Sequence, residues 1–159
     1  MRADELPLWE RTLIAAYRWR RVDPVPFATL KKPPAECRVA LVTTAGLTAP
    51  GQPPFDLRRR GGDPSFRVLP GDVDVASLSL HHRSHAFERQ AVVADPNVAF
   101  PLDRLRELVA AAEVGEVAPR HPSFMGSITT PGRLRKETAP AAADVLVADR
   151  VDIALLAPV

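Results

Sequence analysis

Apolar positions recur at helical spacing in two stretches of the chain. In residues 5–21 the apolar side chains lie three or four positions apart, and arginines gather towards the carboxyl end. Cations there complement the negative end of a helix dipole, so this stretch predicts an amphipathic N-terminal helix. In residues 101–113 the apolar spacing follows Pro101 in a first turn and stops before Gly115. This stretch predicts a second helix, with one apolar face and one charged face.

Other stretches have the pattern of strands. The β-branched apolar run 38–44 is typical of a strand buried on both faces, and alternation in 66–69 and 75–80 predicts two more short strands. Residues 138–148 predict a helix capped by its first residue, a threonine, and the apolar run 151–157 follows at once. A helix that leads into an apolar strand is half of a βαβ unit and implies a parallel sheet. We expect that last strand to lie inside the sheet.

The expected fold is therefore α/β, a mostly parallel sheet flanked by helices and incomplete at the C-terminus, with an N-terminal amphipathic helix. The 17 prolines concentrate in residues 24–34, 50–54 and 119–140, which predicts loops there. A length of 159 residues suits one compact domain. We expect residues 1–34 to form a helix and a proline-rich linker, and residues 35–159 to form the α/β domain.

Charge and cysteine content narrow the classes of partner. The 21 basic and 19 acidic residues are interleaved and give a net charge of +2, and the basic run Arg58–Arg60 is expected to be a solvated loop. No nucleic acid is therefore expected as a partner. The single cysteine, Cys37, excludes an internal disulfide and fits a reducing compartment, which predicts a cytoplasmic location. The start of the chain has neither a signal-peptide nor a membrane-span pattern, so no membrane partner is expected.

Four stretches, taken in order, carry a resemblance to a known family. They are CRVALVTTAGL (37–47), GDPSFRVLPGD (62–72), DPNVAFPLDRLREL (95–108) and APRHPSFMG (118–126), of which the third is the most specific. Together they resemble the selenoprotein B family of the glycine, sarcosine, betaine and D-proline reductases. The resemblance covers residues 33–159. The chain departs from the family pattern at Pro122, Ala86 and Glu88.

The resemblance implies an activity and partners. Reductases of this family cleave a C–N bond of a small amino acid or amine derivative, which makes them oxidoreductases that act on X–H and Y–H to form an X–Y bond, with a disulfide as acceptor. A selenol takes part in the redox step, and disulfide-type carriers supply electrons. The implied partners are a small-molecule substrate, other reductase components and a thioredoxin-like reductant. Selenocysteine is the one special group implied, and no other cofactor is identifiable.

The resemblance also implies where the redox residue belongs. In related sequences the strand that resembles residues 152–159 runs directly into a selenocysteine or a cysteine, followed shortly by Pro and a second cysteine. We therefore expect no catalytic residue within the chain and a selenocysteine or cysteine directly after Val159. Because the selenocysteine codon ordinarily means stop, we expect a gene read as terminated there, and a fragment that is inactive alone.

Several residues are candidates for substrate binding. They are His121, Ser123, His82, Asp63, Ser65 and Arg104. The first two lie in a predicted loop near the strand ends, where they could hydrogen-bond a carboxylate or shuttle a proton, or else only shape the loop. Turn chemistry explains the Asp63 to Ser65 segment equally well, and Arg104 could clamp a carboxylate or face solvent. His81, His82 and His85 lack the other ligands that a metal site needs, so no metal is expected.

A reading from a different functional class remains open. The chain could be a non-catalytic α/β domain that binds a small ligand or a partner and has kept the fold without the reductive chemistry. A sequence that continues beyond Val159 with a cysteine and a helical pattern would favour the enzyme.

Overall fold

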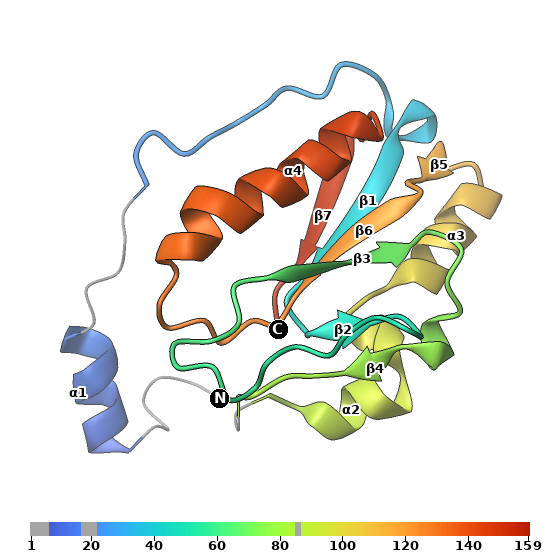
Figure 1. Cartoon of the computed structure of the whole chain (residues 1–159). Coiled ribbons are helices and arrows are strands. Elements are labelled where there is room, and N and C mark those ends of the chain that lie inside the picture. Colours follow the sequence, from blue (N-terminus) through green and yellow to red (C-terminus); the bar gives the residue numbers. More distant parts are fainter. Residues whose placement is uncertain (1–6, 17–21, 85–86) are drawn as a thin grey trace.

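The structure is a computed structural model that describes residues 7–16, 22–84 and 87–159 (Figure 1). The strands are β1 (Arg38–Thr43), β2 (Leu47–Thr48), β3 (Phe66–Pro70), β4 (Ser79–Leu80), β5 (Glu116–Val117), β6 (Arg120–Phe124) and β7 (Ile153–Ala157). The α-helices are α1 (Leu8–Ala16), α2 (Arg89–Ala94), α3 (Leu102–Ala110) and α4 (Ala139–Ala148). Short 3-10 turns span Pro34–Glu36, Val75–Ser77 and Pro96–Val98, and a π-helical turn, Leu134–Thr138, leads into α4.

The five-stranded sheet is mostly parallel, as predicted. β1 pairs in parallel with β5, β6 and β7, while β3 is antiparallel to β6. β2 and β4 form a separate antiparallel pair. The parallel pairing of β1 with β7 follows from the helix α4 between β6 and β7, as expected for a βαβ crossover.

The core lies on the face of the sheet that α3 covers. Leu41 of β1 and Leu69 of β3 are fully buried there in one cluster with Phe100, just before α3, and Leu102, its first residue. On the other face, α4 packs over β6, β1 and β7 (Figure 1). The two layers of helices leave the carboxyl ends of the parallel strands at one edge of the domain.

The last strand differs from its prediction. β7 is a strand and pairs with β1 from Ile153 opposite Val39 to Ala157 opposite Thr43. In the described part of the chain it has no second neighbour, and it forms an edge of the sheet. Its side chains Leu155 and Leu156 are 48% and 67% exposed. The predicted interior position is therefore wrong in this structure, because an apolar run of strand length does not specify how many strands flank it.

A second correction concerns the predicted loop at residues 119–126. It contains β6, which lies between β3 and β1 at the centre of the sheet. Proline cannot donate to a ladder and is uncommon in central strands. Here Pro122 lies opposite Val68 of β3, and the side chain of His121 supplies an acceptor for β1 in place of a backbone carbonyl.

Two further boundaries differ from the predictions. Residues 75–80 begin as a 3-10 turn rather than a strand, because the carboxylate of Asp74 accepts a hydrogen bond from the backbone N–H of Ala76, 3.0 Å away. The predicted cap of α4 is absent, since the hydroxyl of Thr138 donates to the carbonyl of Pro64 at 2.5 Å. The helix itself is confirmed.

The remaining helix predictions are confirmed or lie partly outside the described residues. α3 falls within the predicted 101–113, but the chain leaves helical geometry at Ala112, with φ +57°, before reaching Gly115. α1 falls within the predicted 5–21, whose other residues, 5–6 and 17–21, lie outside the described part. The amphipathic role of that segment stays a prediction. In the described ranges there is no helix with the length and apolar content that a membrane crossing requires.

Candidate functional site

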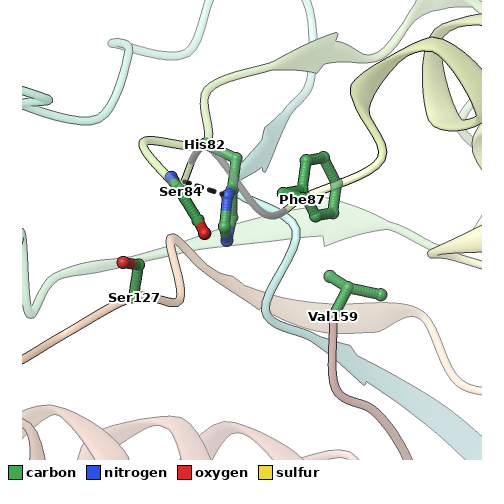
Figure 2. Close-up of a pocket in the computed structure, with 5 residues that line it drawn as sticks. All are labelled: His82, Ser84, Phe87, Ser127 and Val159. Carbon is green, nitrogen blue, oxygen red and sulfur yellow. Dashed lines mark hydrogen bonds between the residues drawn. The ribbon is translucent and has the colours of Figure 1, made fainter. Parts of the chain in front are cut away.

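A pocket opens at the edge of the sheet where the parallel strands end. Its volume is about 260 Å³, and its walls come from three places in the sequence (Figure 2). The lining residues are His82, Ser84 and Phe87 from the segment between β4 and α2, Ser127 after β6, and Val159 after β7. Ligand sites of open α/β sheets form beyond the carboxyl ends of the strands, and this pocket occupies that position.

The end of β7 is fastened to the end of β1 by one threonine. The hydroxyl of Thr44 accepts from the backbone N–H of Val159 at 3.0 Å and donates to the Val159 carbonyl at 3.2 Å. The backbone N–H of Thr44 donates to the carbonyl of Ala157 at 3.3 Å. These contacts hold Val159 in the pocket wall.

His82 is held on the opposite wall by backbone contacts and by stacking. The N–H of His81 donates to the Gly46 carbonyl at 2.9 Å, and the guanidinium of Arg89 donates to the His82 carbonyl. The imidazole stacks on Phe87, with ring centroids 4.2 Å apart and an interplanar angle of 28°. His82 is only 2% exposed. The ring therefore has one fixed position.

The hydrogen bonds of the His82 ring define its protonation. Nδ1 accepts from the backbone N–H of Ser84 at 3.2 Å, so the ring proton of the neutral form belongs on Nε2. Burial lowers the pKa of His82, and the positive charge of Arg89 lowers it further. Nε2 is buried and has no hydrogen-bond partner within the described residues. His82 is thus a neutral donor whose N–H lacks an acceptor in the described part of the chain.

Gly126 packs beside that nitrogen. Its φ of +68° is in the left-handed region that favours glycine. A Cβ at this position would lie 2.5 Å from the Thr44 carbonyl oxygen and 2.9 Å from His82 Nε2. Only glycine therefore lets the chain after β6 pass between Thr44 and His82.

His121 and Ser123 lie elsewhere, on β6. Both are fully buried, and they are two residues apart on the strand and so share its α3-facing side. Nδ1 of His121 accepts from the backbone N–H of Leu41 at 2.9 Å, and the ring meets Phe100 edge to face at 5.6 Å. Burial, with a smaller contribution from Arg106, lowers the pKa of His121 to about 4. Neither residue lines the His82 pocket.

The Nε2 of His121 and the hydroxyl of Ser123 have no hydrogen-bond partner among the described residues. Within the described residues, these two atoms and Nε2 of His82 are the buried side-chain atoms that have no hydrogen-bond partner. His82 differs from the other two because an open pocket lies beside it.

The other candidates are engaged in local contacts. The carboxylate of Asp63 accepts from the N–H of Asp56, and from the N–H and the hydroxyl of Ser65, at 2.7–3.0 Å. Burial raises the pKa of Asp63, but these hydrogen bonds outweigh it and the pKa is lowered. Arg104 is exposed on α3 and pairs with Glu107 at 2.7 Å. None of these side chains lines the pocket, and their roles in substrate binding stay predictions.

The sequence indicated His82 and the strand end at Val159, but not Ser84, Phe87 or Ser127. Phe87 and Ser127 come from segments whose apolar pattern predicted no element, and tertiary placement alone brings them to the strand ends. No group of three or more potential ligands for a metal occurs in the ranges that the structure describes, and His85 of the histidine cluster lies outside them.

Comparisons with known proteins place the chain in a family. The sequence model of glycine/sarcosine/betaine reductase selenoprotein B matches residues 8–158. D-proline reductase subunit gamma of Acetoanaerobium sticklandii is 36% identical over 118 residues, which cover 74% of this chain and 47% of that protein. The chain thus spans about half the length of this relative, and no solved structure matches it. With the pattern of residues 37–126 and the match over 8–158, the chain belongs to the glycine/sarcosine/betaine reductase selenoprotein B family.

Proposed function

We propose that this chain is part of a cytoplasmic reductase subunit that cleaves a C–N bond in a small amino acid or amine derivative. The observation that carries the proposal is the pocket at the carboxyl edge of the sheet, with His82 on one side and Val159 on the other. A selenocysteine or cysteine directly after Val159 would leave the sheet from this wall. Family membership supports a subunit of a multi-component reductase.

The proposed reaction balances with two thiol-type groups. Reductive cleavage of the C–N bond takes up two electrons and two protons and gives a C–H and an N–H bond. The selenol or thiol after Val159 and the second cysteine that follows it would supply both and become joined as a selenenyl sulfide or a disulfide. A thioredoxin-like dithiol then returns that bond to its reduced form. Other reductase components would present the substrate.

Substrate recognition is assigned first to His82. His121 and Ser123 remain candidates from the core face of β6, whereas Asp63, Ser65 and Arg104 would need to act from outside the pocket. The neutral Nε2–H of His82 lies at the pocket and lacks an acceptor within the described residues. A polar group of the substrate supplies that acceptor.

The test expresses the full-length protein from a gene that includes the DNA downstream of the Val159 codon, under conditions that allow selenocysteine to be incorporated. We expect dithiol-dependent reduction of one or more of glycine, sarcosine, betaine and D-proline in the presence of the partner components. Serine in place of the residue after Val159 should abolish it. Reduction that persists in the serine variant contradicts the proposal. A reading frame that encodes neither selenocysteine nor cysteine directly after Val159 also contradicts it.

A second candidate function is a non-catalytic domain that binds a small ligand. The observation that favours it is the pocket itself, which has apolar walls at Phe87 and Val159 and polar groups at His82, Ser84 and Ser127. Saturable ligand binding by the full-length protein would support this function over the reductase if the full reading frame encodes neither selenocysteine nor cysteine directly after Val159.

A further inference from the structure

We infer that the His82 pocket binds the carboxylate of a small aliphatic acid, with the neutral Nε2–H of His82 as the hydrogen-bond donor. The inference names the substrate group of the proposed function and rests on that proposal for treating the pocket as a substrate site. Three features carry it: the fixed tautomer, the local charge and the shape of the walls.

The tautomer makes His82 a donor towards the pocket. The backbone N–H of Ser84 occupies Nδ1 at 3.2 Å, so Nδ1 acts as an acceptor and the proton resides on Nε2. Figure 2 shows the free edge of the ring directed into the space between Ser127 and Val159. A buried donor without an acceptor costs free energy in the unliganded protein, and an acceptor from a ligand removes that cost.

The local charge favours an anionic acceptor over a neutral one. Arg89 donates to the carbonyl of His82, and after burial its positive charge is the second cause that lowers the pKa of His82. His81, the preceding residue, also has a lowered pKa, caused by burial and by the charges of Arg67 and Arg89. The segment therefore lies in a positive potential, which attracts a carboxylate and disfavours an ammonium group next to Nε2.

The walls set the size and character of the rest of the ligand. Phe87 and Val159 form apolar sides, and Ser84 and Ser127 add polar groups. A pocket of about 260 Å³ lies below the usual range for drug-sized ligands, so it suits a molecule with a carboxylate and a few carbon atoms. Gly126 keeps the approach to Nε2 free of a side chain.

The test measures binding by the 159-residue chain and needs no reductase activity. The probes are matched pairs that differ in the carboxylate, D-proline against pyrrolidine and betaine against tetramethylammonium. Nitrogen-15 spectra of labelled histidine report the tautomer and the Nε2–H of His82 directly. The signal of His121, which does not line the pocket, reports in the same sample whether the fold is intact.

We expect His82 to be neutral with its proton on Nε2, and its Nε2–H signal to shift saturably with D-proline and betaine only. His82→Phe, which keeps the ring stack but has no donor, should weaken binding about tenfold or more, whereas His82→Gln, which restores an N–H, should stay within about threefold of the wild type.

Three results would overturn the inference: a proton on Nδ1, equal responses to D-proline and pyrrolidine, or no response of Nε2–H to any carboxylate. If His82→Phe does not fold, the wild-type spectra alone decide. A chain that binds carboxylates in this way while the full protein reduces none of them would contradict the proposed reductase and leave this inference standing.

Discussion

His82 and His121 have the same local chemistry in two different regions of the molecule. Each is buried, accepts a backbone N–H at Nδ1, and leaves Nε2 without a partner among the described residues. His121 lies in the central strand β6 with Phe100 at its edge, whereas His82 lies beside an open pocket. The difference teaches that a fixed tautomer does not by itself mark a binding residue. Whether such a histidine can bind a ligand is decided by what lies next to its Nε2.

The largest expected effect is at His121. Replacing it by alanine removes the acceptor of the Leu41 N–H and leaves a cavity in the core, so His121→Ala should lower the free energy of unfolding by about 3 kcal/mol. His82→Ala, beside the pocket, should lower it by about 1 kcal/mol. Urea unfolding followed by far-UV circular dichroism measures both. Equal losses would break the distinction between the two histidines.

Acid should lower the stability of the chain next, with His121 as the main titrating group. The pKa of His121 falls from its ordinary 6.5 to about 4 in the folded chain. Between these values the unfolded chain binds a proton that the folded chain does not, so stability is full above about pH 6.5 and falls by about 3 kcal/mol as the pH drops to 4. The lowered pKa of His82 acts in the same direction.

The control for this pH effect is His121→Asn, which keeps an acceptor for the Leu41 N–H but does not titrate. The free energy of unfolding of this variant should depend less steeply on pH than that of the wild type. The expected difference in slope corresponds to the uptake of up to one proton fewer on unfolding, measured from urea midpoints between pH 7 and 4. An unchanged slope would show that His121 is not the group that titrates.

Gly126 offers a more local test of the pocket. A Cβ there would overlap the Thr44 carbonyl and crowd His82 Nε2 in a left-handed conformation, so Gly126→Ala should cost about 2 kcal/mol of stability. At Gly132 a Cβ meets nothing within 4 Å, and Gly132→Ala should leave stability unchanged or raise it by up to about 1 kcal/mol. Thermal unfolding of both variants gives the contrast, and a neutral Gly126→Ala would contradict the described path of the chain.

The smallest effect is expected at Ser123, with the opposite sign. Its hydroxyl is buried without a partner among the described residues, so Ser123→Ala should raise stability by up to about 1 kcal/mol. The control is Thr43→Val on β1, which loses the hydrogen bond to the Ala99 carbonyl, 2.8 Å, and should be destabilised by about 1–2 kcal/mol. A destabilised Ser123→Ala, compared by urea midpoints, would show that the hydroxyl has a buried partner such as water.

The sequence predicted the elements whose residues follow simple patterns. β1 is a continuous apolar run, and α4 followed by β7 has the order of a parallel crossover, so both the strands and their direction could be inferred. β6 could not be, because its buried residues include His121 and Ser123, whose polarity is typical of a loop. Its burial depends on contacts with β1 and β3 that are distant in sequence.

The candidate site was predictable to a smaller extent. His82 was indicated through the family resemblance, whereas Phe87 and Ser127 had no pattern to indicate them. The position of Ser127 depends on Gly126, which allows the chain after β6 to turn towards His82, and that of Val159 depends on Thr44. Such long-range placement is set by packing and not by local spacing.

The side-chain acceptor in the ladder of β1 has a consequence for dynamics. The amide of Leu41 is protected from exchange with solvent by the imidazole of His121, not by a peptide oxygen. Protonation of His121 removes the lone pair of Nδ1, so the hydrogen bond that protects the Leu41 amide at the centre of the sheet is lost in acid. Opening events that begin in the middle of the sheet, and not at its margins, would then become more frequent as the solution is acidified.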